Sequence, residues 1–265
     1  MSKPVLGNIE YVIFDMDGLL MYVHAGLTMT DPGSDSERIY TVVTNEILAR
    51  YGYEMTWEIK QGIMGKVTRD AAQYLYDHFP GLEEQLSIED YLSERTIKQE
   101  ALFRQVPPMT GAVNLVRHLY DAGVPIALAT GSNYANLLLK TSHLPEIFDL
   151  FPPANILTAD SPEVKPGRGK PQPDIFLAAA HSLGRDVGTA HSCTEAQRAE
   201  RAKGLVFEDA VPGVKAGVAA HMNVVWVPDE QLRALAPHED YGSAQVLRSL
   251  EEWDPTQWGL KAYLS

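Results

Sequence analysis

The chain has 265 residues, is 45% hydrophobic and 22% charged, and carries a formal net charge of −13. This composition is typical of a folded globular protein, and the negative field disfavours nucleic acid as a partner. The single cysteine excludes an intramolecular disulfide. No signal-peptide pattern or apolar run of about 18 residues occurs, so we expect a cytoplasmic protein without a membrane span or an obligate protein partner.

The first predicted strand covers residues 9–14 and is followed directly by Asp15, Met16, Asp17 and Gly18. Side chains two residues apart on an extended segment point to the same side, so Asp15 and Asp17 converge while Met16 turns away. Gly18 permits the sharp exit that such a turn needs. On its own, a carboxylate pair after a strand is more often part of a turn or a helix cap than of a functional site.

Residues 36–105 differ from the rest of the chain, because they have helical patterning and no convincing strand. The helical patterns span residues 36–51, 68–78 and 87–105. A Pro-Pro pair follows this helical stretch. Residues 21–35, which precede it, show neither a helical nor a strand period. We therefore predict a helical cap domain at 36–105, an extended hinge or insertion at 21–35, and a core domain formed by 1–20 and 107–265.

The core domain alternates between apolar runs and helical patterns. Further strands are predicted at residues 124–129, 204–207 and 223–227, with a weaker one at 156–159. The helical patterns span residues 111–121, 133–140, 173–183 and 211–221. Alternating strands and helices predict an α/β fold with a Rossmann-like parallel sheet that is covered on both faces, and the helical cap is inserted into it.

Two of these later strands end in residues that suit phosphate or metal chemistry. The strand at 124–129 is followed by Thr130, Gly131 and Ser132, and hydroxyls with free N–H groups at a helix start form an anion site. Ser and Asn are also ordinary helix caps there. The strand at 204–207 is followed by Glu208 and Asp209, adjacent acids that suit either a hard divalent cation or a helix cap.

A lysine in the same half of the chain completes the set. Lys170 lies in a Gly-Lys-Pro-Gln-Pro-Asp string just before a predicted helix, and the prolines fix the backbone that presents it. A lone loop lysine is usually solvated, and Lys165 is a rival five positions earlier. In an open parallel sheet, ligands bind outside the carboxyl ends of the strands. Acids, hydroxyls and a lysine gathered at that edge predict a phosphoryl-transfer centre.

Four strings occur in a fixed order along the chain: YVIFDMDGLL, IALATGSN, GKPQPDIFLAAA and LVFEDAVPGVKAG. Together they resemble the haloacid dehalogenase superfamily of phosphohydrolases, in the branch with a helical cap inserted after the first motif. The resemblance runs from residue 8 to residue 229, apart from 21–34 and 188–203. The strings DSERIY, MGK and SPEV extend the likeness to the pseudouridine-5′-phosphatases of this family.

The resemblance implies a magnesium-dependent phosphatase that hydrolyses a small phosphorylated metabolite, a nucleoside or sugar monophosphate such as pseudouridine 5′-phosphate, through an aspartyl-phosphate. Asp15 would be the nucleophile, and Asp17 would protonate the leaving oxygen and then activate water. The Mg²⁺ ligands would be Asp15, the backbone carbonyl of Asp17, Glu208 and Asp209. The phosphoryl oxygens would be held by Thr130, Gly131, Ser132 and Lys170.

Specificity is expected to come from the cap, because the core motifs recognise only phosphate and metal. Lys66 and Arg69, near the start of a predicted helix, are the cap candidates for substrate contact, and a surface role is about as common for such residues. The chain departs from the family pattern at residues 21–34, which are either a longer hinge or an aberrant insertion. The spacing from Lys165 to Lys170 is also expanded, and the retained Gly-Lys-Pro context favours Lys170.

Two other functions are consistent with the same motifs. A phosphomutase would share the core and use Arg69 to bind a second phosphate. A non-catalytic binding protein would keep the fold without the reaction, and retention of the two aspartates of the first motif, Lys170 and Asp209 argues against it.

Overall fold

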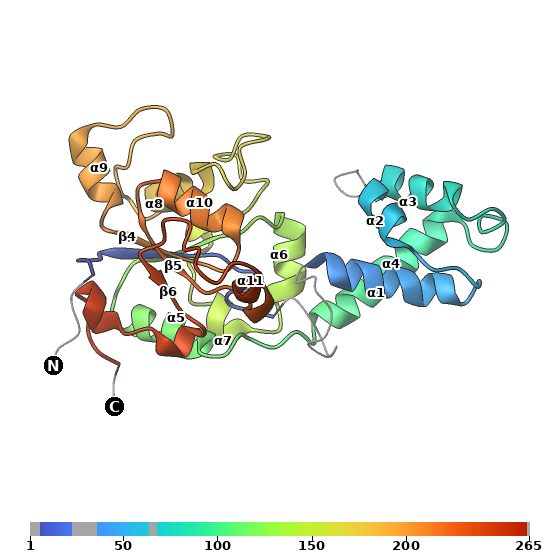
Figure 1. The fold of residues 1–265 in the computed structure, drawn as a ribbon, viewed down its shortest axis with the longest axis horizontal. Helices are drawn as coiled ribbons and strands as arrows, with labels where there is room; N and C mark the ends of the chain where they lie inside the picture. The colour runs from blue at the N-terminus through green and yellow to red at the C-terminus, as the bar shows by residue number, and fades with distance from the viewer. Residues whose placement is uncertain (1–5, 23–35, 64–67, 264–265) are drawn as a thin grey trace. The chain divides into compact units, whose positions relative to one another are not determined.

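The computed structural model describes residues 6–22, 36–63 and 68–263 (Figure 1). The chain divides into two compact units, one formed by Met1–Tyr22 with Pro107–Ser265 and the other by Val23–Val106. Within the described residues, no helix is both long and apolar enough to cross a membrane.

The first unit is built on a six-stranded sheet in which every neighbouring pair is parallel. The strands are β1 Tyr11–Phe14, β2 Ile126–Ala129, β3 Ile156–Leu157, β4 Gly204–Glu208, β5 Asn223–Trp226 and β6 Gln245–Val246. Their order across the sheet is β3-β2-β1-β4-β5-β6, which places β1 in the middle between β2 and β4. The predicted Rossmann-like α/β fold is therefore confirmed.

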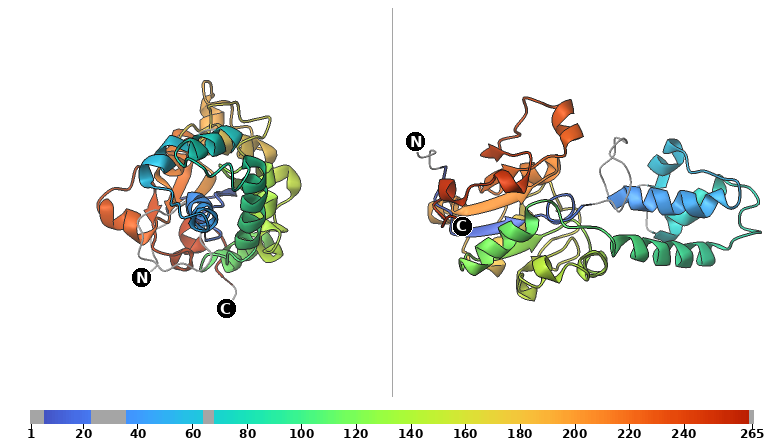
Figure 2. Two further views of the ribbon diagram at one scale, coloured as in Figure 1. Left: turned by 90° about the vertical axis from the view of Figure 1, so that its right-hand side faces the viewer. Right: turned by 90° about the horizontal axis from the view of Figure 1, so that it is seen from below.

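Helices of the first unit cover both faces of the sheet (Figures 1 and 2). They are α5 Ala112–Asp121, α6 Tyr134–Thr141, α7 Pro145–Phe148, α8 Asp174–Ser182, α9 Glu195–Arg201, α10 Val211–Ala219 and α11 Glu230–Leu235. Three 3₁₀ turns accompany them: η1 Pro153–Asn155, η2 Leu250–Glu252 and η3 Pro255–Trp258.

The two faces of β1 are buried in different apolar layers, because successive strand residues point to opposite sides. Ile13 packs with Phe176 of α8 and Val214 of α10. On the other face, Phe14 stacks on Phe207 of β4 with ring centroids 5.1 Å apart. Each such side chain contributes about 1.5–3 kcal/mol when fully buried, so both faces of β1 help to stabilise the sheet.

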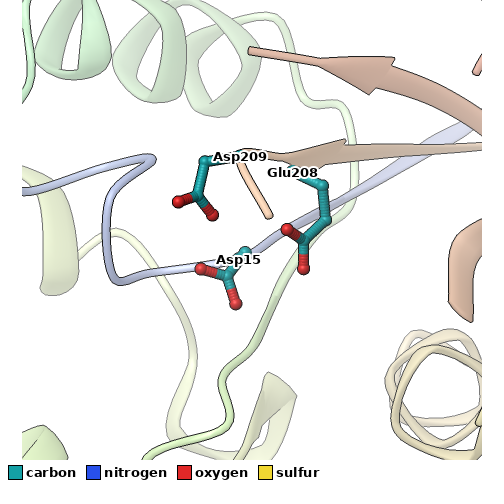
Figure 3. Close-up of side chains that lie close together, drawn as sticks. All are labelled: Asp15, Glu208 and Asp209. Atoms are coloured by element: carbon teal, nitrogen blue, oxygen red, sulfur yellow. The ribbon is translucent and has the colours of Figure 1, made fainter. Parts of the chain in front are cut away.

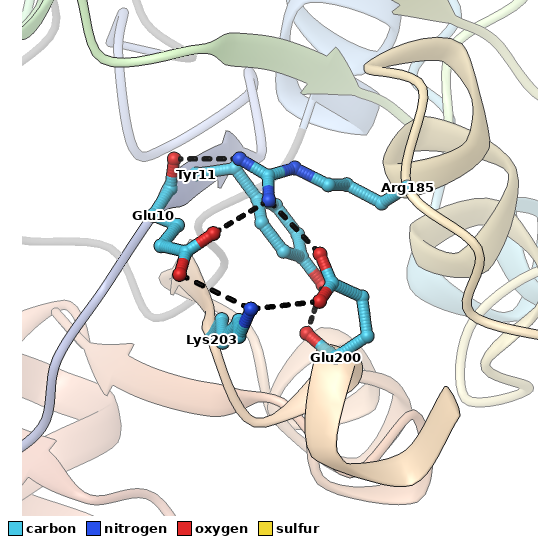
Figure 4. Close-up of polar contacts among 5 residues, drawn as sticks. All are labelled: Glu10, Tyr11, Arg185, Glu200 and Lys203. Carbon is cyan, nitrogen blue, oxygen red and sulfur yellow. Dashed lines mark hydrogen bonds and ion pairs between the residues drawn. The ribbon is translucent and has the colours of Figure 1, made fainter. Parts of the chain in front are cut away.

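A network of charges lies at the amino end of β1 (Figure 4). Arg185 donates to Glu10 at 2.7 Å and to Glu200 at 2.9 Å, and its guanidinium lies over the Tyr11 ring. Lys203 pairs with the same two glutamates at 3.1 and 3.0 Å. The network ties β1 to α9, and because its members are partly exposed each pair contributes at most about 1 kcal/mol.

The described residues of the second unit form four helices, α1 Ser36–Ala49, α2 Trp57–Ile63, α3 Thr68–Asp77 and α4 Ile88–Phe103. Ser87 caps α4 by accepting a hydrogen bond from the Asp90 N–H at 3.1 Å. Inside the unit, Thr44 of α1 and Tyr91 of α4 share a buried hydroxyl–hydroxyl hydrogen bond of 3.1 Å. The described residues of this unit form no strand, in keeping with its helical patterning.

Several elements have no counterpart in the sequence prediction, among them β6, the helices α2, α7 and α11, and the three 3₁₀ turns. Strand β6 has only two residues, Gln245 and Val246, so it leaves no apolar run to detect. Helix α2 is seven residues long and contains Gly62, too short and too irregular for a clear period. Element ends differ by at most two residues, in part because caps such as Asn133 and Ser87 lie outside the helices that they begin.

Candidate active site

Three carboxylates meet at the carboxyl ends of β1 and β4 (Figure 3). The register pairs Phe14 with Phe207, so Asp15, directly after β1, and Glu208, the last residue of β4, lie side by side at this edge of the sheet. One oxygen from each of Asp15, Glu208 and Asp209 lies within 4.8 Å of the others. Asp15 and Glu208 are buried, with 6% and 1% of their surface exposed.

Burial and repulsion raise the pKa values of Asp15 and Asp209 within this carboxylate cluster (Asp15, Glu208 and Asp209). Burial is the main cause that raises the pKa of Asp15 to about 7, and Glu208 adds to the rise while Lys170 opposes it. Burial also raises the pKa of Asp209 well above its ordinary value, again with help from Glu208 and Asp15. A cation bound among these oxygens would therefore offset the cost of burying and crowding their negative charges.

Lys170 reaches the same cluster from the loop before α8. Its amine donates to the Asp15 carboxylate and to Oε1 of Glu208 at 2.6 Å, and it lies 5.0 Å from the centre of the Phe176 ring. Burial opposes the charge of this amine, but Asp15 and Glu208 outweigh burial and raise the pKa of Lys170. The lysine therefore stays protonated beside Asp15. Lys165, its rival in the sequence, is exposed.

The loop that carries Lys170 is held by a guanidinium. Arg168 donates two parallel hydrogen bonds to Asp174, of 3.0 and 2.7 Å, and a third to Gln172 at 3.2 Å. Bidentate Arg–carboxylate pairs fix geometry more strongly than single contacts do. The bonds of Arg168 therefore span the two sides of Lys170 and limit where its amine can point.

Glu208 has a defined place because Gly213, in the first turn of α10, lies beside it. Its Oε2 accepts from the Ala210 N–H at 3.0 Å, and its Oε1 accepts from Lys170. A Cβ at Gly213 would lie only 1.6 Å from Oε1 of Glu208. No side chain fits there, so the glycine lets the helix approach the carboxylate.

Gly213→Ala is therefore expected to displace Glu208 and to release Lys170, although alanine favours a helix by about 1 kcal/mol over glycine. Overpacking of this kind costs about 1–3 kcal/mol, so we expect both lower thermal stability and at least about tenfold slower turnover. Gly169→Ala is the matched control, because its Cβ would meet no atom within 4 Å. Equal activity of the two variants would contradict this role of Gly213.

The Thr130-Gly131-Ser132 turn lies at the carboxyl end of β2, next to β1. The Thr130 hydroxyl is fully buried and accepts from the Ser132 N–H at 3.0 Å. A Cβ at Gly131 would meet nothing within 4 Å, so the turn has open space in front of it. The Ser132 hydroxyl donates to Oδ2 of Asp17 at 2.9 Å. The turn thus places two hydroxyls just before α6, beside the first motif, while the N–H groups of Thr130 and Ser132 are bonded within the protein.

Asp17 does not share the carboxylate cluster. Its carboxylate instead accepts from Ser132 and, through Oδ1, from the Lys140 amine at 2.7 Å. Lys140 is absent from the sequence prediction, although its side chain is only 2% exposed. The one local signal is its position on the buried face of α6 with Leu137 and Thr141, where an apolar residue is expected.

The predicted cap residues are only partly described. Lys66 falls within residues 64–67, outside the described residues, as do residues 23–35 of the predicted hinge. Arg69 is exposed on α3 and pairs with Glu89 at 2.7 Å. The structure therefore brings the core residues of the prediction together around the ends of β1, β2 and β4, and it places Arg69 on the surface of the helical unit.

Comparisons with known proteins give a consistent result. The model of the haloacid dehalogenase-like hydrolases matches residues 9–221. The chain is 38% identical to (DL)-glycerol-3-phosphatase 1 of Arabidopsis thaliana over 97% of this chain and 76% of that protein. It is 36% identical to a probable pseudouridine-5′-phosphatase of Drosophila melanogaster over 99% of both chains. A haloacid dehalogenase family hydrolase of Deinococcus radiodurans, solved with phosphate and sodium bound, superposes with a TM-score of 0.60 at 26% identity, covering 94% of this chain and 95% of that one.

Proposed function

The chain belongs to the haloacid dehalogenase-like hydrolases and is a phosphatase, and from this premise we propose that Asp15 is the nucleophile. The observation that carries the proposal is the contact between Asp15, at the end of the central strand, and the protonated, largely covered amine of Lys170. Lys170 favours the ionised carboxylate next to it, and an ionised carboxylate is the form that attacks phosphorus.

Two steps account for the hydrolysis. In the first, an Asp15 oxygen bonds to phosphorus, the ester P–O bond breaks, and Asp17 gives its proton to the leaving alkoxide. In the second, Asp17 takes a proton from water, the water oxygen bonds to phosphorus, and the P–O bond to Asp15 breaks. Inorganic phosphate leaves, and both aspartates return to their starting forms. Thr130, Gly131, Ser132 and Lys170 would hold the phosphoryl oxygens in both steps.

The chemistry of the donor set fits Mg²⁺. Hard divalent cations prefer oxygen ligands, and three carboxylates whose oxygens lie within 4.8 Å of one another supply them. We propose that Asp15, Glu208 and Asp209 hold the ion together with the backbone carbonyl of Asp17. When bound, the ion would offset the negative charge of the phosphoryl oxygens.

The substrate class follows from the chemistry that two relatives share. Glycerol 3-phosphate and pseudouridine 5′-phosphate, after which those relatives are called, are both phosphate esters of a primary alcohol with neighbouring hydroxyls. We propose that this chain acts on such an ester, a polyol, sugar or nucleoside monophosphate. In the helical unit, Lys66 and Arg69 are the proposed substrate contacts, and Arg69 would exchange Glu89 for a group of the substrate.

A phosphate-release screen tests the proposal directly. The panel holds glycerol 3-phosphate, pseudouridine 5′-phosphate, uridine 5′-phosphate and hexose 6-phosphates, each with and without Mg²⁺. We expect one or a few members to release phosphate in equal amount to the alcohol formed, only with Mg²⁺. Isomerised sugar phosphate without free phosphate, dependent on a bisphosphate activator, would show a mutase instead. Turnover that is unaffected by a chelator would contradict the metal assignment.

A further inference from the structure

Lys140 is a buried lysine whose amine is used within the site. Its Nζ donates to Oδ1 of Asp17 at 2.7 Å and to the Ser132 hydroxyl at 3.1 Å. Ser132 in turn donates to Oδ2 of the same carboxylate at 2.9 Å. The three side chains form a closed triangle, and each oxygen of Asp17 has its own donor.

This contact is built by the geometry of α6. Helical side chains tilt toward the amino end of their helix, so a lysine in the last turn reaches back toward the start. The start is fixed by Asn133, whose side chain accepts from the Asn136 N–H at 2.8 Å. Ser132 immediately precedes this cap. The Lys140 amine can therefore contact the Ser132 hydroxyl and the Asp17 carboxylate at the same time.

Packing alone does not account for a lysine at this position. It shares the buried face of α6 with Leu137 and Thr141, and burying an ammonium costs several kcal/mol that pairing must offset. Replacing buried ion pairs by apolar residues of similar volume is often neutral or stabilising. What the amine provides, and an apolar side chain would not, is a fixed orientation of the Asp17 carboxylate.

We infer that Lys140 is the positioning residue of the acid–base aspartate, an inference that rests on the proposed role of Asp17. An ionised carboxylate has about four acceptor positions, and the two donors occupy one on each oxygen. The remaining positions stay free to carry or accept a proton. Each aspartate of the first motif thus accepts a hydrogen bond from a different lysine, Asp15 from Lys170 and Asp17 from Lys140.

The test uses leaving groups that differ in their need for a proton. An alkoxide needs an acid to leave, whereas p-nitrophenolate leaves without one. Lys140→Met should lower kcat/KM for the best alkyl phosphate by about 100-fold, the low end of what general acid catalysis contributes. For p-nitrophenyl phosphate, kcat/KM should fall by less than about fivefold, because that parameter reports only the first step. Lys140→Gln, which keeps a donor, is measured alongside in case the methionine variant does not fold.

A second measurement isolates the route through Asp17. In an Asp17→Asn background, Lys140→Met should lower kcat/KM by less than about threefold further. The effects of two substitutions are not additive when the two residues act as a unit. Lys203→Met is the matched control, since Lys203 also pairs with two acidic residues but lies in the network at the amino end of β1. In this control, kcat/KM for both substrates should stay within about twofold of the values for the unmodified protein.

The outcomes distinguish a failure of the inference about Lys140 from a failure of the proposed role of Asp17. An Asp17→Asn variant with normal turnover would overturn the acid–base assignment, and the inference with it. A crippled Asp17→Asn variant together with equal losses on both substrates in Lys140→Met would overturn the inference alone. Additive losses in the double variant would do the same, because Lys140 would then act by a route that does not pass through Asp17.

Discussion

Asp15→Asn should abolish phosphate release, with a loss of at least about 10⁴-fold in kcat, the scale seen when a nucleophile is removed. An amide cannot form the acyl phosphate, while its shape and one acceptor oxygen are kept. The measurement is steady-state phosphate release from the best substrate of the screen, with intact mass recorded to exclude deamidation back to aspartate. Acid-quenched wild-type protein should carry a phosphoryl group that hydroxylamine removes, and the variant should carry none.

The same variant provides its own folding control. Burial and Glu208 oppose ionisation of Asp15, so replacing it with a neutral amide relieves repulsion in the carboxylate cluster. We expect a melting temperature at pH 8 in the absence of metal that is no lower than that of the wild type. Normal phosphate release from a variant of confirmed mass would reject Asp15 as the nucleophile. Loss of activity together with loss of fold would not count in its favour, and Asp15→Ser would then be measured under the same conditions.

Much of the fold and core site could be predicted because the signals are local. Each of β1, β2, β4 and β5 is an apolar run ended by polar residues, and parallel strands bring their carboxyl ends to one edge. Asp15 and Glu208 become neighbours once β1 and β4 are adjacent in register. Strings such as DMDG and GKPQPD therefore lead to the same edge of the sheet even though they lie far apart in the chain.

The contacts that organise the site could not be predicted, because they join residues with no local pattern. Lys140 contacts Asp17 although the two residues are 123 positions apart in the sequence. The helix that carries Lys140 has an ordinary amphipathic pattern. Arg168 lies in the stretch that expands the lysine spacing, and only its bonds to Asp174 and Gln172 show what it holds. Glu208 reads as a metal ligand or a cap, and in the structure its carboxylate also holds the Lys170 amine.

Mg²⁺ should stabilise the folded protein as well as support turnover. Chelation should reduce phosphate release to background, and added Mg²⁺ should restore it. A ligand that binds only the folded state adds about 2.7 kcal/mol at 100 times its Kd, which a thermal melt measures without reference to activity. Ca²⁺ is a useful comparison, because it also binds carboxylate oxygens but accepts looser geometry. A melting temperature that no divalent ion changes would contradict a metal site in the carboxylate cluster.

The pH dependence of that stabilisation has a definite sign. The folded-state pKa of Asp15 is raised to about 7, above its ordinary value of 3.8, so the folded protein binds more protons than the unfolded chain between these values. Without metal, this group's contribution to stability is therefore fully present below about pH 4 and is lost as the pH rises through 7. The pKa of Asp209 is raised as well.

Protons and Mg²⁺ compete for the same oxygens, so the Mg²⁺-induced rise in melting temperature should be larger at pH 8 than at pH 6. Asp15→Asn should weaken this difference, because one of the carboxylates for which protons and metal compete is gone. An equal metal-induced shift at both pH values would mean that the ion binds somewhere other than at Asp15 and Asp209.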